Sequence, residues 1–243
     1  MNIALVGYGK MGKEIEKVAI GREHSIVDRI SATNRGKHLN LHDADIAIEF
    51  SHPGATLQNI TTCIDQKIPV VCGTTGWVKD FDAAVDYCKN HNGTFFYASN
   101  FSPGVNMFFK LNRALAKIMT RFTDYSVHIE EVHHVHKKDS PSGTAITLAE
   151  AILQNINRLD KWQVGNSTNN ILGIHSERTG EVPGIHKIRY ENDTDIITIR
   201  HDAKNRKGFA VGAVMVSEWI IGKSGYFTMD DYLNSDHLKF AFY

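Results

Sequence analysis

The chain has 243 residues and a mass of 27.2 kDa, enough for one large domain or two modest ones. Hydrophobic residues make up 42% of it, which is ordinary for a globular protein with a sizeable core. The 27 basic and 27 acidic side chains cancel, and this balance argues against a dedicated nucleic-acid binder and against a polybasic membrane binder.

The three cysteines, Cys63, Cys72 and Cys88, show no CxxC spacing, which excludes a disulfide scaffold and a cysteine-type zinc site. No apolar run reaches the ~18–20 residues of a membrane span. The N-terminal residues lack the charged start and the long apolar core of a signal peptide. We therefore expect a cytoplasmic protein with reduced thiols and with neither a membrane nor a nucleic acid as partner.

The first part of the chain alternates short apolar runs with helical patterns. Two of the runs, at residues 3–6 and 69–72, are apolar throughout, which is typical of strands covered on both faces. Between the first two runs, Met11, Ile15 and Val18 fall at helical spacing. Alternation of this kind predicts a doubly wound parallel sheet. The predicted strands cover residues 3–6, 26–30, 46–50, 69–72 and 94–98.

A different pattern follows a long helix predicted at residues 103–121, whose apolar stripe is Phe108, Leu111, Leu115, Ile118 and Phe122. Residues 125–136 alternate as a strand, 144–156 form a helical pattern, and strands joined by turns are expected within 173–200. An almost wholly apolar helix at 210–221 must be buried, and we expect it against the first domain. We therefore predict an α/β protein with an N-terminal Rossmann-like doubly wound parallel sheet, residues 1–101 completed by 208–243, and an inserted α+β domain at 102–207.

The segment VGYGKMG forms a GxGxxG motif directly after a predicted strand and at the start of a helix. Its first two glycines allow a tight turn and close approach to a pyrophosphate, and the third allows close packing of helix and strand. Glycines also occur in many turns without a ligand, but the strand–helix–strand context favours a dinucleotide site. The cofactor-binding residues predicted here are Gly7, Tyr8, Gly9, Lys10, Met11 and Gly12.

Two further segments, CGTTGW and ASNF, follow the fourth and fifth predicted strands. Ligands of open α/β sheets bind beyond the carboxyl ends of the strands, so both segments are expected near the nicotinamide. A glycine-rich turn capped by threonine is the alternative for the first of them. The cofactor-binding residues predicted here are Gly73, Thr74, Thr75, Ala98, Ser99, Asn100 and Phe101.

The end of the second predicted strand bears on the choice between NADPH and NADH. Rossmann domains that prefer NAD place an acidic residue there, but this strand is followed by Ser31 and, further on, Arg35. Asp28 lies within the strand and is expected to point to one side of the sheet. Because Ser31 and Arg35 suit a 2′-phosphate, we expect NADPH to be used at least as well as NADH. The alternative is a polar loop with Arg35 in solvent.

The stretch EEVHHVHKKDSPSGT, residues 130–144, holds the densest group of titratable side chains. On a strand, His133 would share one face with Glu131, while His134 and His136 would share the other. The two latter histidines could bind a metal, but a third ligand is missing from any recognisable pattern. Solvated histidines without a role are the second alternative. We favour an anion-binding acid/base cluster, because Lys137 follows and Ser142, Gly143 and Thr144 open a helix.

Together, VGYGKMG, CGTTGW, ASNFSPGVN, HHVHKKDSPSGTA and HDAKNRKGFAVGAV resemble the 4-hydroxy-tetrahydrodipicolinate reductase family of the bacterial diaminopimelate–lysine route. The resemblance spans nearly the whole chain, and HHVHKKDSPSGT is far more specific than the glycine motif. It implies reduction of a small cyclic dicarboxylate by NADPH or NADH to tetrahydrodipicolinate. It also implies that the inserted domain binds the substrate and assembles a homotetramer.

The positions within these motifs imply roles for single residues. His133 matches the acid/base residue of the family, and Lys137 matches its proton donor. The residues predicted to hold the substrate's carboxylates are His134, Ser142, Gly143 and Thr144. No metal site is implied.

Three other functions are compatible with parts of the sequence. Another Rossmann-type oxidoreductase acting on a small carboxylate has no reason to carry HHVHKKDSPSGT. A regulator that binds NAD(P) without catalysis needs neither His133 nor Lys137. A metal-dependent hydrolase using His134 and His136 would contain bound metal and lose its activity to a chelator.

Overall fold

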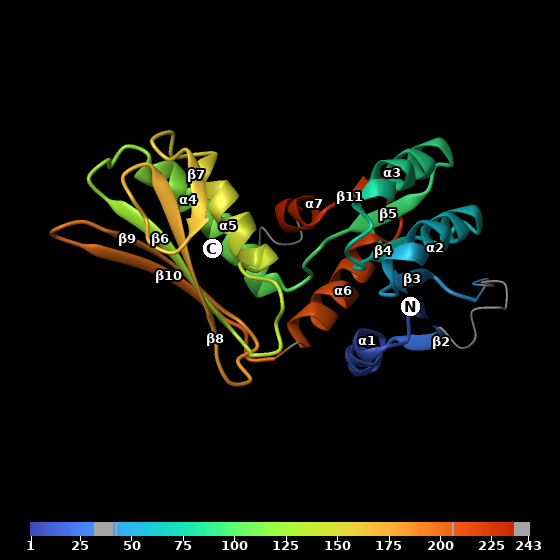
Figure 1. Ribbon diagram of the computed structural model, residues 1–243. Helices are drawn as coiled ribbons and strands as arrows, with labels where there is room; N and C mark the ends of the chain where they lie inside the picture. Colours follow the sequence, from blue (N-terminus) through green and yellow to red (C-terminus); the bar gives the residue numbers. More distant parts are fainter. Residues whose placement is uncertain (32–40, 42, 206, 236–243) are drawn as a thin grey trace. The chain divides into compact units, whose positions relative to one another are not determined.

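The computed structural model describes residues 1–31, 41, 43–205 and 207–235. The chain divides into two compact units (Figure 1). The first consists of Met1–Pro103 together with Lys207–Tyr243, and the second consists of Gly104–Arg206. Within the described residues, each unit is built on one sheet.

The first unit contains a six-stranded sheet in the order β11-β5-β4-β3-β1-β2, and all pairings between its described strands are parallel. The strands predicted in the first part of the chain are all present, each within about a residue of its predicted bounds. Strand β11 was not predicted, because so short a strand carries no readable alternation. The strands are β1 (Asn2–Val6), β2 (Ser25–Ile30), β3 (Ile46–Glu49), β4 (Val70–Cys72), β5 (Thr94–Tyr97) and β11 (Gly225–Phe227).

Helices cover both faces of this sheet (Figure 1). Helices α1 and α6 pack with Ile3 and Leu5 of β1, whereas α2 and α3 belong to the cluster that contains Ala4 and Val6. Since neighbouring strand residues face opposite ways, the two helix pairs lie on opposite faces, and the predicted doubly wound sheet is confirmed. The helices are α1 (Lys10–Gly21), α2 (Pro53–Asp65), α3 (Phe81–Asn90), α6 (Lys207–Ile220) and α7 (Met229–Asn234), with a short 3-10 helix η1 (Val78–Asp80) before α3.

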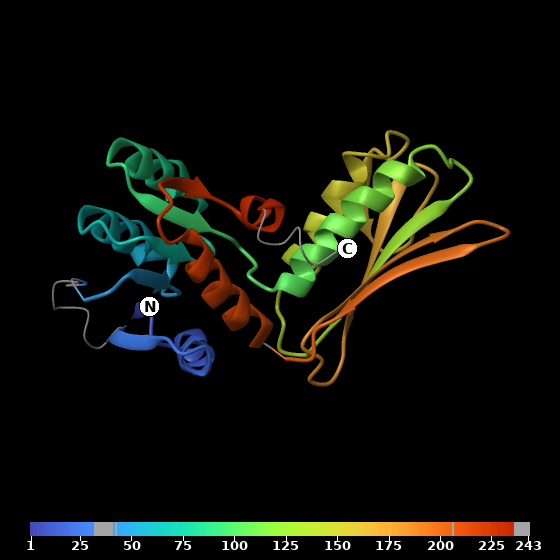
Figure 2. The same ribbon diagram turned by 180° about the vertical axis from the view of Figure 1, so that it is seen from behind.

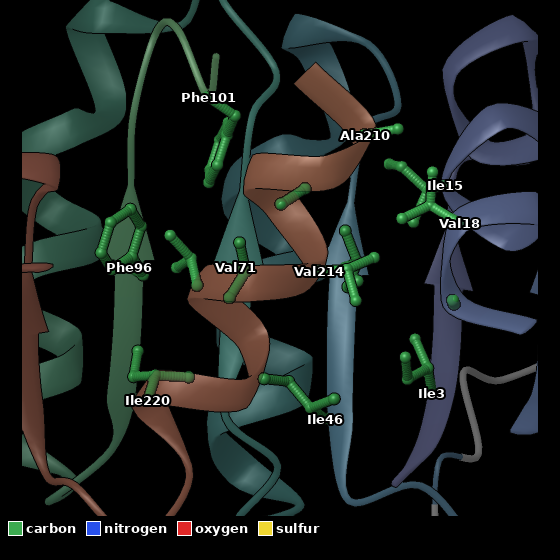
Figure 3. Packing of buried hydrophobic residues seen from close by; sticks show 14 of the residues in the cluster. Ile3, Ile15, Val18, Ile46, Val71, Phe96, Phe101, Ala210, Val214 and Ile220 are labelled. Atoms are coloured by element: carbon green, nitrogen blue, oxygen red, sulfur yellow. The ribbon is translucent and has the colours of Figure 1, made fainter. Parts of the chain in front are cut away.

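Helix α6 is apolar on nearly all sides and packs against the sheet beside α1. Figure 3 shows Val214 and Ile220 of this helix among Ile46, Val71 and Phe96 of the strands. The helix predicted at 210–221 is therefore buried against the first sheet, as expected. No helix in the described part of the chain is long and apolar enough to cross a membrane.

The second unit contains a five-stranded mixed sheet in the order β10-β9-β6-β8-β7. Strand β9 pairs antiparallel with β6 and β10, whereas β8 pairs parallel with β6 and β7. Helices α4 (Pro103–Met119) and α5 (Gly143–Leu153) lie on one face of this sheet (Figure 1, Figure 2). The predicted α+β character is confirmed. The strands are β6 (Ser126–His133), β7 (Lys161–Val164), β8 (Ile171–Arg178), β9 (Ile185–Glu191) and β10 (Ile196–Asp202).

The predicted apolar stripe of α4 is partly wrong. Phe108 is buried, but Leu111 and Ile118 are 59% and 58% exposed. The buried face instead includes Asn112, whose Nδ2 donates a hydrogen bond to the carbonyl oxygen of Leu148 at 3.0 Å. The buried face of α4 includes a polar residue, and apolar residues lie on its exposed side. The spacing of apolar residues alone therefore predicts the wrong buried face.

Gly212 lets α6 approach the chain that follows β5. A Cβ atom at this position would lie 1.7 Å from the carbonyl oxygen of Phe101 and 3.3 Å from Cδ of Pro103. The first distance is far below van der Waals contact, so only glycine fits without a movement of the backbone.

The variant Gly212→Ala is therefore expected to be less stable than the wild type. Overpacking of this kind costs about 1–3 kcal/mol, or roughly 2–12 °C in Tm for a chain of this size. Thermal unfolding measures the difference. Gly21→Ala is the control, since nothing lies within 4 Å of a Cβ atom there, and it is expected to keep the wild-type Tm or exceed it slightly. Equal Tm values for Gly212→Ala and wild type would contradict the close approach.

Candidate active site

The turn after β1 is fixed by contacts with two other strands. The backbone N–H groups of Gly7 and Tyr8 donate hydrogen bonds to the carbonyl oxygen of Ile30 at 2.9 and 2.8 Å. Gly7 has a φ of +106°, and a Cβ atom on it would lie 2.1 Å from the carbonyl oxygen of Phe50. The first glycine of the motif is thus required by its conformation and by the neighbouring chain.

The other two glycines of the motif have different surroundings. A Cβ atom on Gly12 would lie 2.5 Å from the carbonyl oxygen of Gly7, so this glycine packs helix α1 onto the turn. Gly9 is the N-cap residue of α1, and no atom lies within 4 Å of its Cβ position. The second glycine therefore leaves open space at a helix N-terminus, where a phosphate binds well.

A pocket lies at the carboxyl ends of β1 and β3. Strand β1 has β2 on one side and β3 on the other, so the strand order reverses here, and ligands of open α/β sheets bind at such a point. Of the predicted cofactor residues, Gly7, Tyr8, Gly9 and Ser31 line it. Asp28 is half-buried and is not among the described lining residues. The lining residues are Val6, Gly7, Tyr8, Gly9, Ile30, Ser31, Phe50, Ser51, His52 and Asn59.

The CGTTG segment lies behind this pocket and supports its wall. A Cβ atom on Gly73 would lie 2.2 Å from Cζ of Phe50, so only glycine lets that ring stand where it does. The hydroxyl of the buried Thr74 accepts a hydrogen bond from the backbone N–H of Ser51 at 2.8 Å. Thr75 is exposed. None of these three residues belongs to the described lining.

The remaining predicted cofactor residues also lie outside the lining. Lys10 begins α1, and Met11 packs against the core. In the ASNF segment Ala98 and Phe101 are buried, whereas Ser99 is exposed. The side chain of Asn100 accepts a hydrogen bond from the backbone N–H of Ser102. Arg35 lies outside the described residues.

Glu49, at the end of β3, was missed by the sequence analysis. It is fully buried and accepts hydrogen bonds from the backbone and hydroxyl of Ser51, from Nδ2 of Asn59 at 3.2 Å and from Sγ of Cys72 at 3.2 Å. Burial raises the pKa of the Cys72 thiol, which keeps its proton for this bond. Ser51 and Asn59 line the pocket, so their hydrogen bonds to Glu49 keep this wall of the pocket in place. An acidic residue in an apolar strand was the available signal.

In the second unit, β6 places Glu131 and His133 on the face covered by helices, with exposures of 1% and 7%. This part of the strand prediction is confirmed, but its extension to residue 136 is wrong. The chain leaves the sheet after His133, and a turn is closed by a hydrogen bond from the backbone N–H of Lys137 to the carbonyl oxygen of His134 at 3.1 Å. His134 and His136 therefore lie in this turn and not on the opposite strand face.

The buried carboxylate of Glu131 is surrounded by four groups. Its Oε1 accepts hydrogen bonds from the backbone N–H of Ser142 and from Nη2 of Arg178, both at 3.0 Å. Its Oε2 lies 3.4 Å from Nδ1 of His133 and 3.5 Å from Nε2 of His186. Burial works to raise the pKa of Glu131, but hydrogen bonds with His186, Ser142, Arg178 and Ser176 outweigh it and hold the pKa well below its usual range. Glu131 is therefore ionised.

Burial lowers the pKa of His133 to about 4, and the neighbouring His186 acts in the same direction. The charge of Glu131 opposes this shift, while Lys137 and Arg178 add to it. His133 is consequently neutral at pH 7. A neutral imidazole can accept a proton or a hydrogen bond, but it is a poor proton donor.

The predicted helix start is confirmed at Ser142, which is the N-cap residue of α5. Its hydroxyl accepts a hydrogen bond from the backbone N–H of Ala145 at 3.2 Å and lies 3.1 Å from Nε2 of His186. Gly143 is exposed, and nothing lies within 4 Å of its Cβ position, while Thr144 is half-buried. The first turn of α5 thus presents backbone N–H groups with room for an anion.

Lys137 stands on the loop between β6 and α5. Its ammonium group lies 2.8 Å from Oδ1 and 2.9 Å from Oδ2 of Asp139, and the pairing with Lys137 holds the pKa of Asp139 below its usual range. The backbone carbonyl of Asp139 accepts a hydrogen bond from Arg178 at 2.6 Å. His134 keeps a buried Nδ1 that has no hydrogen-bond partner among the described residues. The loop therefore carries a cation and an unpaired imidazole nitrogen.

The metal hypothesis for His134 and His136 gains no third ligand from the described residues. Their rings lie 6.0 Å apart, and His136 pairs instead with Glu181 at 3.0 Å. A different group, Glu131 with His133 and His186, has ligand atoms within 4.8 Å of one another in the described chain. Arg178 already neutralises that carboxylate, so a divalent cation there would add unbalanced buried charge.

Two family profiles match the chain in succession. Residues 1–101 match the family described as dihydrodipicolinate reductase, N-terminus, and residues 104–233 match dihydrodipicolinate reductase, C-terminus. The 4-hydroxy-tetrahydrodipicolinate reductase of Christiangramia forsetii is 50% identical over 234 residues, which cover 96% of this chain and 98% of the relative. The enzyme of the same name from Psychrobacter arcticus is 36% identical and covers 90% of this chain and 78% of its own.

Among solved structures, the dipicolinate-bound dihydrodipicolinate reductase from Paenisporosarcina sp. TG-14 matches with a TM-score of 0.75 at 22% identity, covering 94% of this chain and 97% of that one. The glycine turn on a parallel sheet and the second α+β unit define a Rossmann-type oxidoreductase. The chain belongs to the dihydrodipicolinate reductase family. The resemblance found in the sequence motifs is confirmed.

The lowered pKa of His133 couples its protonation to folding. Between about pH 6.5, the ordinary pKa, and about pH 4, the unfolded chain binds a proton that the folded chain does not. The free energy of unfolding is therefore expected to fall as the pH drops through this window, by a few kcal/mol at most, since one pKa unit corresponds to about 1.4 kcal/mol. Urea unfolding at several pH values measures this slope.

The variant His133→Asn is expected to lose this part of the slope, because it has no imidazole to protonate. His175→Asn, at an exposed position of the same sheet, is the control and is expected to keep the wild-type slope. Identical slopes for wild type and His133→Asn would contradict the buried neutral state of His133.

Proposed function

We propose that this protein reduces 4-hydroxy-tetrahydrodipicolinate to tetrahydrodipicolinate with NADPH or NADH, as a step of diaminopimelate and lysine biosynthesis. Family membership over nearly the whole chain supports the reaction. The structural observation that supports this reaction is that one segment of the second unit contains His133, Lys137 and the open start of α5. A cyclic dicarboxylate needs both an anion site and a proton donor, and this segment offers both.

The net reaction replaces a carbon–oxygen bond of the ring by a carbon–hydrogen bond. One hydride and one proton are added, and the hydroxyl group leaves as water. The dinucleotide supplies the hydride when it is bound. The protein must therefore hold the dicarboxylate, deliver the proton and exclude competing water.

Lys137 and His133 take the catalytic roles in this proposal. The ammonium group of Lys137 delivers the proton, and its pairing with Asp139 orients it before the substrate arrives. His133 is neutral at pH 7, so its unprotonated ring nitrogen is the group that accepts a proton or a hydrogen bond from the substrate. The burial of its ring keeps it in that state.

The substrate's carboxylates bind at the start of α5. The exposed backbone at Gly143 and the hydroxyl of Thr144 supply donors, and the helix dipole favours negative charge there. The proposed substrate-binding residues are His134, Ser142, Gly143 and Thr144.

The first unit binds the dinucleotide in this proposal, at the pocket beyond β1 and β3. The open space at Gly9 and the N-terminus of α1 suit the pyrophosphate. The proposed cofactor-binding residues are Gly7, Tyr8, Gly9, Lys10, Met11, Gly12, Ser31, Arg35, Gly73, Thr74, Thr75, Ala98, Ser99, Asn100 and Phe101.

The second unit, at about residues 102–207, is proposed to bind the substrate and to assemble a homotetramer. One face of its sheet carries α4 and α5, and the other carries ion pairs such as Glu130 with Lys187 at 2.9 Å. That second face is available for pairing with further copies of the chain. A biosynthetic reductase that consumes NADPH or NADH belongs in the cytoplasm, and the three buried thiols suit that reducing compartment.

The reaction is tested by following the absorbance of reduced nicotinamide with freshly generated 4-hydroxy-tetrahydrodipicolinate. We expect Lys137→Ala to lower kcat by about 10²–10⁴-fold, the usual effect of losing a general acid. Lys138→Ala is the matched control, because its exposed side chain follows directly, and it is expected to keep wild-type turnover. Absence of turnover by folded wild type with both cofactors, or full turnover by Lys137→Ala, would overturn the respective proposal.

NADPH is expected to give a catalytic efficiency at least equal to that of NADH. Ser31 lines the pocket beyond β2, no carboxylate is among the described lining residues, and Arg35 follows in sequence. Arg35→Ala is expected to lower kcat/KM for NADPH more than for NADH, since a charge-assisted contact with the 2′-phosphate is lost. A strong NADH preference that this variant leaves unchanged would contradict the assignment.

The homotetramer is tested by light scattering coupled to size exclusion. The expected mass is about four times the 27.2 kDa of the chain. A mass equal to that of a single chain at working concentration would refute the assembly while leaving the proposed reaction untouched.

A further inference from the structure

Glu131 contacts two parts of the proposed substrate site directly. Its Oε1 accepts from the backbone N–H of Ser142 at the start of α5, and its Oε2 faces Nδ1 of His133. Within the described chain, neither Oε2 of Glu131 nor Nδ1 of His133 makes a well-aligned hydrogen bond to any other group. Oε2 of Glu131 faces both imidazoles, at 3.4 Å from Nδ1 of His133 and 3.5 Å from Nε2 of His186, and among the described residues it is the carboxylate oxygen that faces Nδ1 of His133.

Arg178 connects Glu131 to the loop that carries Lys137. Its Nη2 donates to Glu131 at 3.0 Å and to the backbone carbonyl of Asp139 at 2.6 Å. The carboxylate of Asp139 in turn pairs with Lys137 at 2.8 Å. The proposed proton donor, the proposed acceptor and the anion-binding helix start are thus joined through one carboxylate that is only 1% exposed.

The charge of Glu131 decides which nitrogen of His133 carries the proton. An ionised carboxylate can only accept hydrogen bonds, so a nitrogen that faces it must be the protonated one. Besides Glu131 on its own strand, His133 faces His186 on β9, Arg178 on β8 and Lys137 on the following loop, and these three oppose a second proton. The ring therefore carries its single proton on Nδ1.

Nε2 of His133 is then the hydrogen-bond acceptor of the ring, and the lack of a side chain at Gly184 leaves room beside it. A Cβ atom on Gly184 would lie 3.1 Å from Nε2 of His133, where glycine places none. Nε2 of His133 is thus unprotonated and faces a position without a side chain.

We propose that Glu131 is a positioning residue: it holds His133 in the form protonated on Nδ1 and ties this imidazole to the start of α5 and, through Arg178, to the loop of Lys137. Glu131 does not touch the substrate. Its effect on turnover rests on the proposed function, whereas its effect on the imidazole does not. Glu131 plays the part that the carboxylate plays in a catalytic triad, where it orients a histidine. Here the oriented imidazole accepts a proton or a hydrogen bond through its other nitrogen.

The tautomer is measured by NMR of the chain labelled with ¹⁵N-histidine, with the signal of His133 assigned from the variant His133→Asn. We expect His133 of the wild type at pH 7 to be protonated on Nδ1. In Glu131→Gln the side-chain amide can donate to Nδ1, so we expect the proton to move to Nε2. Glu150→Gln is the matched control: it makes the same change at an exposed position of α5 and is expected to leave the tautomer unchanged.

Steady-state kinetics provide the second arm. We expect Glu131→Gln to lower kcat/KM for the dicarboxylate by about 10²-fold or more, as the loss of the correct tautomer does elsewhere, without changing the affinity for NADPH. Glu150→Gln is expected to keep wild-type kinetics. A folded Glu131→Gln variant with unchanged tautomer and kcat/KM would overturn the proposal.

The two proposals fail in distinguishable ways. If folded wild type lacks turnover with both reduced cofactors, the proposed function fails, but the NMR measurement still decides the role of Glu131. If Glu131→Gln does not fold, the wild-type spectrum decides alone, because His133 protonated on Nε2 would refute the proposed contact.

Discussion

A carboxylate removed from water is tolerated only where hydrogen bonds and an opposite charge replace its hydration. Glu131 imposes this requirement on the second unit, and each of its partners comes from a different element. Arg178 ends β8, Ser142 caps α5, and His186 stands on β9. Satisfying one buried charge therefore fixes the ends of several elements around His133.

The first unit also buries an acidic side chain, and the described hydrogen-bond donors around it are neutral. Glu49 ends β3, and its partners Ser51, Asn59 and Cys72 belong to the following loop, to α2 and to β4. The loop held in this way forms one wall of the pocket at the strand reversal. In both units a buried carboxylate near the end of a strand organises the loops in which ligand-binding residues lie, while the sheet supplies a rigid base.

The glycine turn shows how fold and ligand impose different demands on similar residues. Gly7 and Gly12 are required by the chain itself, because a side chain on either would collide with a backbone carbonyl. Gly9 faces open space, so its lack of a side chain serves access to the helix N-terminus. A motif read as one functional unit thus divides into two packing positions and one binding position.

The strands of the first unit could be predicted closely because buried parallel strands are short apolar runs, a property of neighbouring residues. The start of α5 was equally readable, since Ser142 and the residues after it form a local cap. The motif around His133 also carried the family resemblance, because the order of residues along the chain suffices for it. These features were determined by the sequence alone.

The tertiary structure decided what depends on residues far apart in the chain. Arg178 lies 47 positions from Glu131, and no local pattern connects them. The buried face of α4 depends on Leu148, 36 positions from Asn112, so apolar spacing within the helix pointed to the wrong stripe. Strand β6 ends at His133 because the chain turns there toward Lys137, although the alternation of residue types continues. Local sequence specifies propensity and pattern, whereas the partners of buried polar groups are chosen only when distant segments pack together.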